Sequence, residues 1–374
     1  MKKIILSVVA MSTLVLAGGD IPLVTPEVET SNGFFDRFHA KGDLRLRYES
    51  IERNDKDNKY RNRYRLRLGA KIDLIDNLQF EVGMRSGFAN PTSGNQTLFK
   101  YQSLGDYFFQ SLRFNILGLS YTSNNATYKL GRQPYMMYRP IKSQLVWDND
   151  VSMNGVNYHY KDDTKSITLG INQPTLEEAS VAQDDVTLFI AQYVHKTKLN
   201  AAKLNLGTGI YYYDGLKGNT TLFGSSKGNT VVDGYYTNDY HIVEGFAELQ
   251  LQDIFGKTLK LATGIVYNFG ADENNFGYDV AVQLGKAKEV GDWQVKYSYT
   301  DLQEDATLGA YSDSDNFSGG TAASGHAIRA KYKVGKKFYV AANFFFNELY
   351  ESKSRIEGMD VTYERVQLDA IIKF

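Results

Sequence analysis

Basic and apolar residues alternate along the stretch from Tyr60 to Leu74. The basic residues have odd numbers and the apolar residues have even ones; the two sets are Arg61, Arg63, Arg65, Arg67 and Lys71, and Tyr64, Leu66, Leu68, Ala70, Ile72 and Leu74. Successive side chains of a strand point to opposite faces, whereas a helix would spread these arginines around its circumference. The pattern therefore predicts a strand with one cationic face and one apolar face.

The same two-residue period recurs along the rest of the chain. Phe114 and Ile116, for example, are expected to share one face of a strand, with Arg113 on the other. Alternating segments lie near 39–51, 78–84, 112–116, 128–130, 156–160, 167–171, 185–194, 202–213, 240–251, 258–269, 277–284, 293–300, 326–334, 338–349 and 362–374. We count about sixteen strands in all, each close to the roughly 9–11 residues that a tilted strand needs to cross a bilayer.

Short and long connections alternate between these segments. Short ones lie at 76–77, 123–125, 253–257 and 335–337, and long polar ones at 214–239 and 301–324. This regularity is typical of an up-and-down antiparallel barrel with short periplasmic turns and long extracellular loops, and Greek-key crossings would break it in a sandwich. The period alone leaves both readings open: in a soluble sandwich the leucines point inward, and in a membrane barrel they meet lipid while the arginines line a wet lumen.

The N-terminus favours the membrane reading. Met1-Lys2-Lys3, an apolar run to Leu16 and the small residues from Ala17 onward predict a secretory signal peptide over residues 1–17. A periplasmic lead segment over 18–38 and a single barrel domain over 39–374 would follow. No later stretch of the sequence approaches the roughly 18 apolar residues of a membrane helix. A membrane protein of this kind must therefore be a barrel, because helices and closed barrels alone satisfy their own backbone in lipid.

Composition agrees with an all-β protein. The 374 residues include 27 Tyr and 21 Phe but only 2 Trp and 6 Pro, and aromatic residues favour strands. Aromatic residues also fall at the ends of the apolar faces, as expected at two membrane–water interfaces; these are Tyr48, Tyr64, Tyr121, Tyr212, Phe269, Trp293, Tyr299 and Phe344. The absence of Cys excludes disulfides and thiolate metal sites. The net charge of −1 gives no basic excess for nucleic acid.

Two parts of the chain resemble known outer-membrane proteins. The closing strand ends in Phe374 and looks like the terminal signal that the barrel assembly machinery reads. Leu130-Gly131-Arg132-Gln133, followed by Val146-Trp147-Asp148-Asn149-Asp150 and Gly155, resembles the "GRQ … D-x-D … G" pattern of putative porins. The resemblance implies a homotrimer in the outer membrane of a Gram-negative bacterium. It also implies a third loop, about 134–150, that folds into the barrel and narrows it, with Arg132, Gln133, Asp148 and Asp150 at the constriction.

With the apolar face assigned to lipid, the charged face lines the lumen. The inward basic residues are Arg45, Arg47, Arg63, Arg65, Arg67, Lys71, Arg85, Arg113, Arg329, Lys331 and Arg365, and the opposing acidic residues are Glu244, Glu248 and Asp279. We therefore hypothesise a cationic arc that faces a smaller acidic patch across water, which would orient and select solutes by a transverse field. If the strand parities slip by one residue in places, the lumen instead carries no pronounced field.

The function predicted from these features is passive diffusion of ions and small hydrophilic solutes through an outer-membrane porin, without a reaction, a cofactor or a metal. Its partners would be the lipid bilayer, the assembly machinery and the solutes. The five histidines are dispersed and show no metal-ligand spacing. Two alternatives remain. One is a substrate-specific channel for phosphate-like anions built on the arginines. The other is an enzyme or adhesin that a barrel anchors, with His159 as a candidate partner for a serine.

Overall fold

The computed structural model describes residues 33–87, 90–98, 111–174, 186–200, 202–353, 358–359 and 361–374. The predicted signal peptide and residues 18–32 of the lead segment lie outside these residues. Contacts between residues divide the chain into Met1–Asp36 and Arg37–Phe374. The second unit contains all of the strands, and it is described here by itself.

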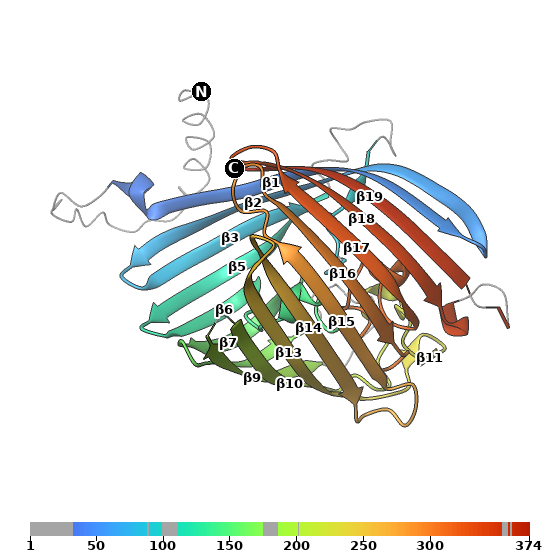
Figure 1. The fold of residues 1–374 in the computed structure, drawn as a ribbon. Helices are drawn as coiled ribbons and strands as arrows, with labels where there is room; N and C mark the ends of the chain where they lie inside the picture. Colours follow the sequence, from blue (N-terminus) through green and yellow to red (C-terminus); the bar gives the residue numbers. More distant parts are fainter. Residues whose placement is uncertain are drawn as a thin grey trace. The chain divides into compact units, whose positions relative to one another are not determined.

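The wall of the unit is one antiparallel sheet in which each long strand pairs with the next long strand along the chain (Figure 1). Its sixteen long strands are β1 (Phe38–Arg53), β2 (Lys56–Ile75), β3 (Leu78–Ser86), β5 (Leu112–Ser123), β6 (Ala126–Pro134), β7 (Ser152–Lys161), β8 (Lys165–Gln173), β9 (Thr187–Leu199), β10 (Ala202–Asp214), β13 (Tyr240–Ile254), β14 (Lys257–Asn268), β15 (Phe276–Gly285), β16 (Trp293–Leu302), β17 (Ala323–Lys333), β18 (Phe338–Leu349) and β19 (Val361–Lys373). Strand β1 pairs with both β2 and β19, which closes the ring. The predicted up-and-down barrel is therefore confirmed.

The remaining elements are short. They are β4 (Gln96–Thr97), the hairpin of β11 (Val231–Val232) and β12 (Tyr235–Tyr236), and the 3-10 segments η2 (Phe34–Arg37), η3 (Pro140–Lys142), η4 (Leu222–Gly224), η5 (Asn316–Ser318) and η6 (Glu351–Lys353). Within the described part of the chain, no helix is long and apolar enough to span a membrane.

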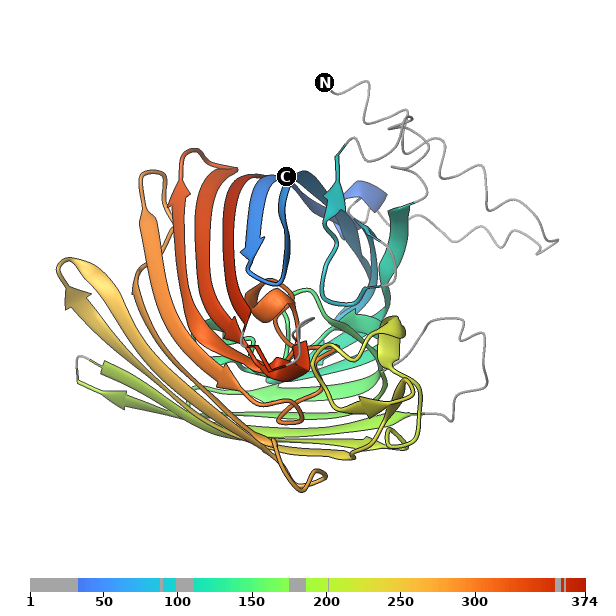
Figure 2. The ribbon, with the colours of Figure 1, turned by 90° about the vertical axis from the view of Figure 1, so that its right-hand side faces the viewer.

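The connections separate into two kinds, one at each end of the barrel. The turn end carries the tight turns, such as Asp76-Asn77, where Asn77 has φ of 68°; asparagine tolerates this left-handed conformation better than most residues. The loop end carries the long connections, of which three matter below: L3 (135–151), L5 (215–239) and L7 (303–322). In Figure 2 the orange segment that contains η5, a part of L7, lies inside the ring of strands.

The two faces of the wall have the predicted polarity. On the outer surface Leu46 and Leu68 are 49% and 41% exposed, whereas Arg47 and Arg65 point inward and are 4% and 7% exposed. A soluble protein buries large apolar side chains and exposes arginines, so this arrangement rules out the soluble sandwich. Tyr64 departs from the prediction: it is 4% exposed, and its hydroxyl lies 3.3 Å from Ser111 Oγ. Gln96 of β4, its neighbour in the sheet, and Ser111 both belong to the connection between β3 and β5, so this connection lies against Tyr64 where lipid was expected.

A β-bulge in β5 overturns one predicted face. Gly83 pairs with Ile116 and Met84 with Phe114, so Asn115 is an extra residue with no partner on β3. Ile116 consequently turns inward, toward Gly83, while Leu117 takes the outer face and is 52% exposed. A bulge places two residues of one strand opposite one residue of its partner. A prediction that assumes a strict two-residue period cannot detect such a bulge.

The "GRQ" glycine has a conformational reason for its place. Gly131 has φ of +94°, and a Cβ there would lie 2.5 Å from the carbonyl oxygen of Leu117. Its partner across the β6–β7 pair is Gly155, where a Cβ would lie 2.1 Å from the carbonyl oxygen of Ile171. Side chains at these two positions would force the strands apart. The wall on both sides of L3 therefore requires glycine.

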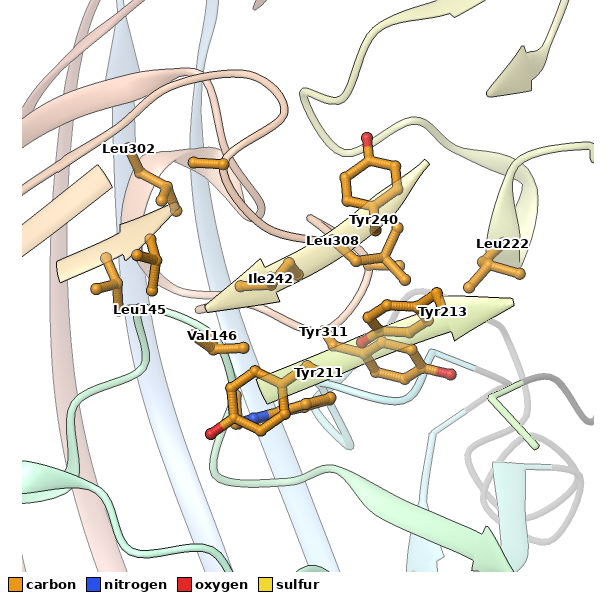
Figure 3. Close-up of a cluster of buried hydrophobic side chains, with 14 of the residues drawn as sticks. Leu145, Val146, Tyr211, Tyr213, Leu222, Tyr240, Ile242, Leu302, Leu308 and Tyr311 are labelled. Atoms are coloured by element: carbon orange, nitrogen blue, oxygen red, sulfur yellow. The ribbon is translucent and has the colours of Figure 1, made fainter. Parts of the chain in front are cut away.

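One side of the lumen is filled by a hydrophobic core. Leu145, Val146 and Trp147 of L3 and Leu308 and Tyr311 of L7 pack against inward-facing residues of the wall (Figure 3). The wall residues in this core include Leu188, Ile190, Tyr211, Tyr213, Tyr240, Ile242 and Val266. Strand β10 shows the consequence, because Tyr211 and Tyr213 are fully buried on its inner face while Ile210 and Tyr212 are exposed on its outer face. The core thus leaves open space only on the other side of the lumen.

Candidate constriction site

L3 crosses the lumen and is fixed at its tip to the far wall. The backbone N–H of Ile141 donates to Glu248 Oε2 at 2.7 Å, and Ser143 Oγ donates to Asp279 Oδ2 at 2.5 Å. The apolar start of the loop serves the same docking, since Met137 is 6% exposed in the luminal core and Tyr138 stacks on Phe246 with ring centroids 5.8 Å apart. L3 is therefore a folded partition that leaves part of the lumen open.

The three acidic residues expected opposite the arginines have other partners. Glu248 pairs with Lys260 at 2.6 Å besides holding L3, and Glu244 accepts a hydrogen bond from Tyr211 at 2.6 Å. These two residues and Asp279 are all less than a tenth exposed. Their carboxylates anchor the wall and L3, and Glu248 and Asp279 also line the cavity that Arg329 and Lys331 line. The partners of the arginines come from elsewhere.

A second loop, which the sequence placed outside the barrel, supplies some of these partners. L7 folds into the lumen and joins L3: Asp148 N–H donates to the carbonyl of Tyr311 at 2.7 Å, and Ser314 N–H donates to Asp148 Oδ2 at 2.9 Å. Gln144 Nε2 also donates to Asp313 Oδ2 at 2.9 Å. The signal that could have revealed this is the set of apolar residues Leu308, Tyr311 and Phe317 within a polar connection.

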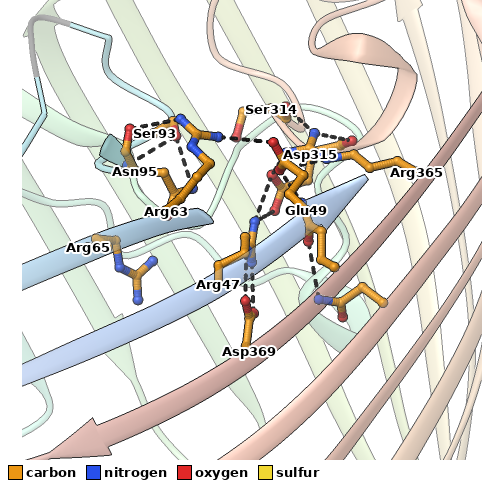
Figure 4. Close-up of polar contacts among 12 residues, drawn as sticks. Arg47, Glu49, Arg63, Arg65, Ser93, Asn95, Ser314, Asp315, Arg365 and Asp369 are labelled. Atoms are coloured by element: carbon orange, nitrogen blue, oxygen red, sulfur yellow. Dashed lines mark hydrogen bonds and ion pairs between the residues drawn. The ribbon is translucent and has the colours of Figure 1, made fainter. Parts of the chain in front are cut away.

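The loop-end half of the arginine arc surrounds a fully buried carboxylate, Glu49, and a partly buried one, Asp315 (Figure 4). Arg365 donates to Glu49 at 3.0 Å through Nε and to Asp315 at 2.9 Å through an Nη, and Arg47 lies 3.3 Å from Asp315. Arg47 also forms a fork-like pair with Asp369 at 2.6 and 2.8 Å. Burial by itself raises the pKa of Asp315, but Arg47 and Arg365 outweigh it and hold that pKa well below its usual range. Asp315 therefore stays charged and ties L7 to the wall.

The middle of the arc binds the end of L3. Arg65 and Arg67 each contact Asp43, at 2.9 and 2.6 Å, and each contacts Asp150, at 3.3 and 3.1 Å. Burial opposes the charged form of Asp150, yet Arg65 and Arg67 hold its pKa below the ordinary value. Burial, with Asp150 and Asp313 nearby, raises the pKa of Asp148 well above its ordinary value. Of the two carboxylates of the D-x-D stretch, Asp150 thus faces the arginines, and Asp148 joins L3 to L7.

The other predicted basic residues are more scattered. Lys71 pairs with Glu81 at 2.8 Å and Arg329 with Asp313 at 2.9 Å. Arg45 donates to Asn95 at 2.5 Å. Further contacts involve carbonyl oxygens: Arg63 donates to Asn95 at 2.8 Å, and Arg85 donates to Asn90, Pro91 and Asp150 at 2.5, 3.2 and 3.3 Å. Arg113 lies opposite Arg85 in the sheet and is exposed.

The remaining predicted positions support the wall. Gln133 is 2% exposed and donates to the carbonyl of Leu119 at 2.8 Å, next to the partly buried Arg132. The backbone of Phe374 exchanges two hydrogen bonds with Gly42, at 2.8 and 3.0 Å, so the last residue completes the seam. His159 Nδ1 lies 2.9 Å from Thr168 Oγ1 on the neighbouring strand.

Three adjoining cavities follow the open side of the lumen, and cations predominate in each. The cavity at the loop end, about 300 Å³, is lined by Lys59, Arg61 and Lys227 among others. The next, about 280 Å³, lies between the arc and the two loops, and the third, about 350 Å³, runs between L3 and strands β14–β17. The first two share Ser314 and Asp315. The last two share Arg329 and Lys331. Among the residues described, no group of three or more His, Cys, Asp or Glu could hold a metal ion.

Comparisons with known proteins give a family and a fold. A family model described as "Putative porin" matches residues 47–259 and 257–374. A high-pH structure of OprB from Pseudomonas putida is similar over 91% of this chain and 95% of its own, with 14% identity and a TM-score of 0.60. OmpF from Salmonella typhi in complex with daunomycin is similar over 90% and 97%, with 13% identity and a TM-score of 0.52. A comparison with proteins of curated function finds no match.

Proposed function

This chain belongs to the putative porin family, and on that premise we propose that ions and small hydrophilic solutes diffuse through its lumen across the outer membrane, with a preference for anions. The family and the barrel support an outer-membrane porin of a Gram-negative bacterium. The preference for anions and the place where solutes are selected go beyond what the family supports, and both are argued from the charges of the lumen.

The observation that carries the proposal is the excess of cations along the open path. The middle cavity is lined by five basic residues, Arg45, Arg47, Arg65, Arg329 and Lys331, and by four acidic ones, Asp148, Asp150, Asp315 and Asp369. Around the loop-end cavity the basic residues Lys56, Lys59, Arg61, Arg63, Lys227 and Arg365 outnumber the single acidic residue, Asp315. Low-dielectric walls strengthen such a field and concentrate counter-ions. Anions are therefore concentrated at the loop-end mouth before they reach the arc.

The arc and the two loops act together as the filter. Arg65 and Arg67 are held by Asp43 and Asp150, so their guanidinium groups keep fixed positions. Arg67 is the most accessible member of this group, with its side chain 39% exposed. A solute that passes L3 meets a row of positive groups on the wall and a largely neutralised loop. The size of the solutes that can pass is limited by the space that the luminal core leaves open.

Replacing Arg63, Arg65 and Arg67 together by alanine is expected to turn the anion preference into a cation preference. The change removes three positive charges and leaves Asp43 and Asp150 without their main partners. The measurement is the reversal potential of the purified protein in a planar bilayer with a KCl gradient. The matched control removes three lysines outside the lumen, Lys286, Lys288 and Lys336, which are exposed at the turn end. An unchanged reversal potential in the arginine variant would contradict the proposed filter.

We also propose that three copies assemble, as the porin resemblance implies. Support comes from a shallow apolar groove of about 800 Å³ on the outer surface of the barrel, lined in part by the small side chains of Ala330, Ala342 and Ala370. Ala342→Trp, which fills the groove, is expected to convert a trimer into monomers, whereas Leu169→Trp on the opposite wall leaves it intact. Light scattering of the detergent-solubilised protein measures the mass. A monomeric wild-type protein would contradict the trimer.

A further inference from the structure

Lysines gather around one tyrosine at the turn end of the lumen. The Nζ atoms of Lys331, Lys373 and Lys333 lie 4.6, 5.0 and 5.7 Å from the centre of the Tyr339 ring. These residues come from three neighbouring strands, β17, β18 and β19. They lie nearer the turn end than Arg47 and Arg365, so they form a group separate from the loop-end half of the arc.

The tip of L3 adds a fourth lysine from the other side. Lys142 and Lys331 line the same cavity of about 350 Å³. The tip has little freedom, because Ile141 N–H donates to Glu248 and its carbonyl accepts from Lys296 Nζ at 3.1 Å. Lys142 itself has φ of 56°, a left-handed conformation that is uncommon for lysine. Burial lowers the pKa of Lys142, and the nearby cations Arg139, Lys373 and Lys260 lower it further.

The carboxylates near these lysines are already engaged. Glu248 is paired with Lys260, Asp279 with Ser143 and Asp313 with Arg329. Asp43, the acidic group whose charge acts on Lys331, is held by Arg65 and Arg67. Over the described ranges, none of Lys142, Lys331 and Lys373 has a carboxylate within ion-pair distance. The lumen thus contains three ammonium groups that face one region and lack acidic partners.

Like charges repel, and a tyrosine ring attracts cations without neutralising them. A solute with two or more negative charges can offset all three ammonium groups at once, and hydrogen bonds between charged groups are stronger than neutral ones. The arginine fork favours a planar partner, whereas lysine binds as a flexible point charge and does not require one. The site can therefore accept a tetrahedral phosphate as well as a carboxylate.

We propose that Lys142, Lys331 and Lys373 form a binding site for small multivalent oxyanions, either phosphate or a di- or tricarboxylate, between the tip of L3 and the inner wall of β17–β19. The inference rests on the proposed channel function and deepens it. An anion held there lies in the conducting path, so it competes with chloride for passage. Because the site lies on the turn side of L3, the block of the chloride current also depends on the side of the membrane to which the anion is added.

The test is block of the chloride current by added anions. Phosphate and citrate are added in turn to each side of a planar bilayer that contains the purified protein in KCl. In the wild-type protein, one or both are expected to reduce the current at concentrations where added chloride does not, and more strongly from one side. The Lys142→Ala/Lys331→Ala variant should raise the half-blocking concentration by roughly tenfold or more, because two charged hydrogen-bond donors are lost. Lys336→Ala, an exposed lysine of the turn between β17 and β18, should not change it.

The outcomes separate the two proposals. A wild-type channel that conducts KCl but is blocked by neither anion overturns the lysine site and leaves the porin function intact. Equal block of the double variant and the Lys336→Ala control also overturns it. If no current is seen, the porin function fails, and calorimetric titration of phosphate and citrate into the detergent-solubilised protein still measures the site. Block by phosphate alone or by citrate alone identifies which oxyanion the site accepts. Lys331→Arg, which keeps the charge, is expected to keep the block.

Discussion

Replacing Trp147 by alanine is expected to raise the single-channel conductance several-fold and to make the current noisy. Trp147 is 1% exposed and lies edge-on to Tyr211 of the wall, with ring centroids 5.1 Å apart. It also contacts Tyr311 of L7, at 5.9 Å. Truncating a buried tryptophan costs about 3–5 kcal/mol, so the variant loses a large contact between L3 and the core. An undocked L3 opens and closes the lumen as it moves.

The control for this prediction is the other tryptophan of the chain. Trp293 is 37% exposed on the outer surface, so Trp293→Ala removes the same side chain without touching either loop. Single-channel recording should give a wild-type current for Trp293→Ala and a larger, fluctuating one for Trp147→Ala. In a Trp293→Phe background Trp147 is the only tryptophan, and its fluorescence reports whether L3 is buried. A quiet, wild-type conductance in Trp147→Ala would show that L3 does not limit the current.

Replacing Glu49 by glutamine is expected to be the most destabilising charge change in the barrel. Glu49 is fully buried, with Arg61 and Arg365 in direct contact and Arg63 at 3.6 Å. Removing one partner of a buried ion pair leaves uncompensated charge and costs about 3–5 kcal/mol. Arg365 would also hold Asp315 less firmly, so the wall end of L7 should loosen. The temperature at which the folded band disappears on semi-native electrophoresis should fall clearly.

A second glutamate on β1 provides the control for the Glu49 variant. Glu52 lies on the outer face of the same strand and is exposed. Its carboxylate accepts only a long hydrogen bond, at 3.5 Å, from the hydroxyl of Ser50. Glu52→Gln should therefore melt at the wild-type temperature. Equal melting temperatures for the two variants would mean that the arginines around Glu49 find other partners, and that the buried carboxylate is not required for stability.

The arginine stretch shows why the barrel could be predicted. Arg63 and Arg65 lie on the face of β2 that meets water, and Leu66 and Leu68 lie on the face that meets lipid. Because the two faces need different side chains, the sequence alternates with a two-residue period along the whole strand. The glycines of the "GRQ … G" pattern are local in the same way, because the backbone at Gly131 and the close strand contacts at Gly155 exclude other residues. Asn115 marks the limit, since a bulge shifts every later residue of a strand without changing its composition.

The site was less predictable, because its partners lie far apart in the chain. The distance along the sequence from Glu49 to Arg365 is 316 residues, and that from Arg47 to Asp315 is 268. Polar residues of L7 are typical of an exposed loop, and only the docked Leu308 and Tyr311 show that it turns inward. Glu248 and Asp279 were placed on the correct face, but the face does not reveal that L3 covers them.

The sequence by itself determined the alternation, and with it the strands, their short turns, the closed barrel and the inward direction of the arginines, because each depends on neighbours within a few residues and on the contrast between lipid and water. Tertiary structure alone decided which carboxylates meet those arginines, that L7 joins L3, and that a dry core fills one side of the lumen. Those contacts arise when loops fold back into a space that exists only after the ring of strands has closed.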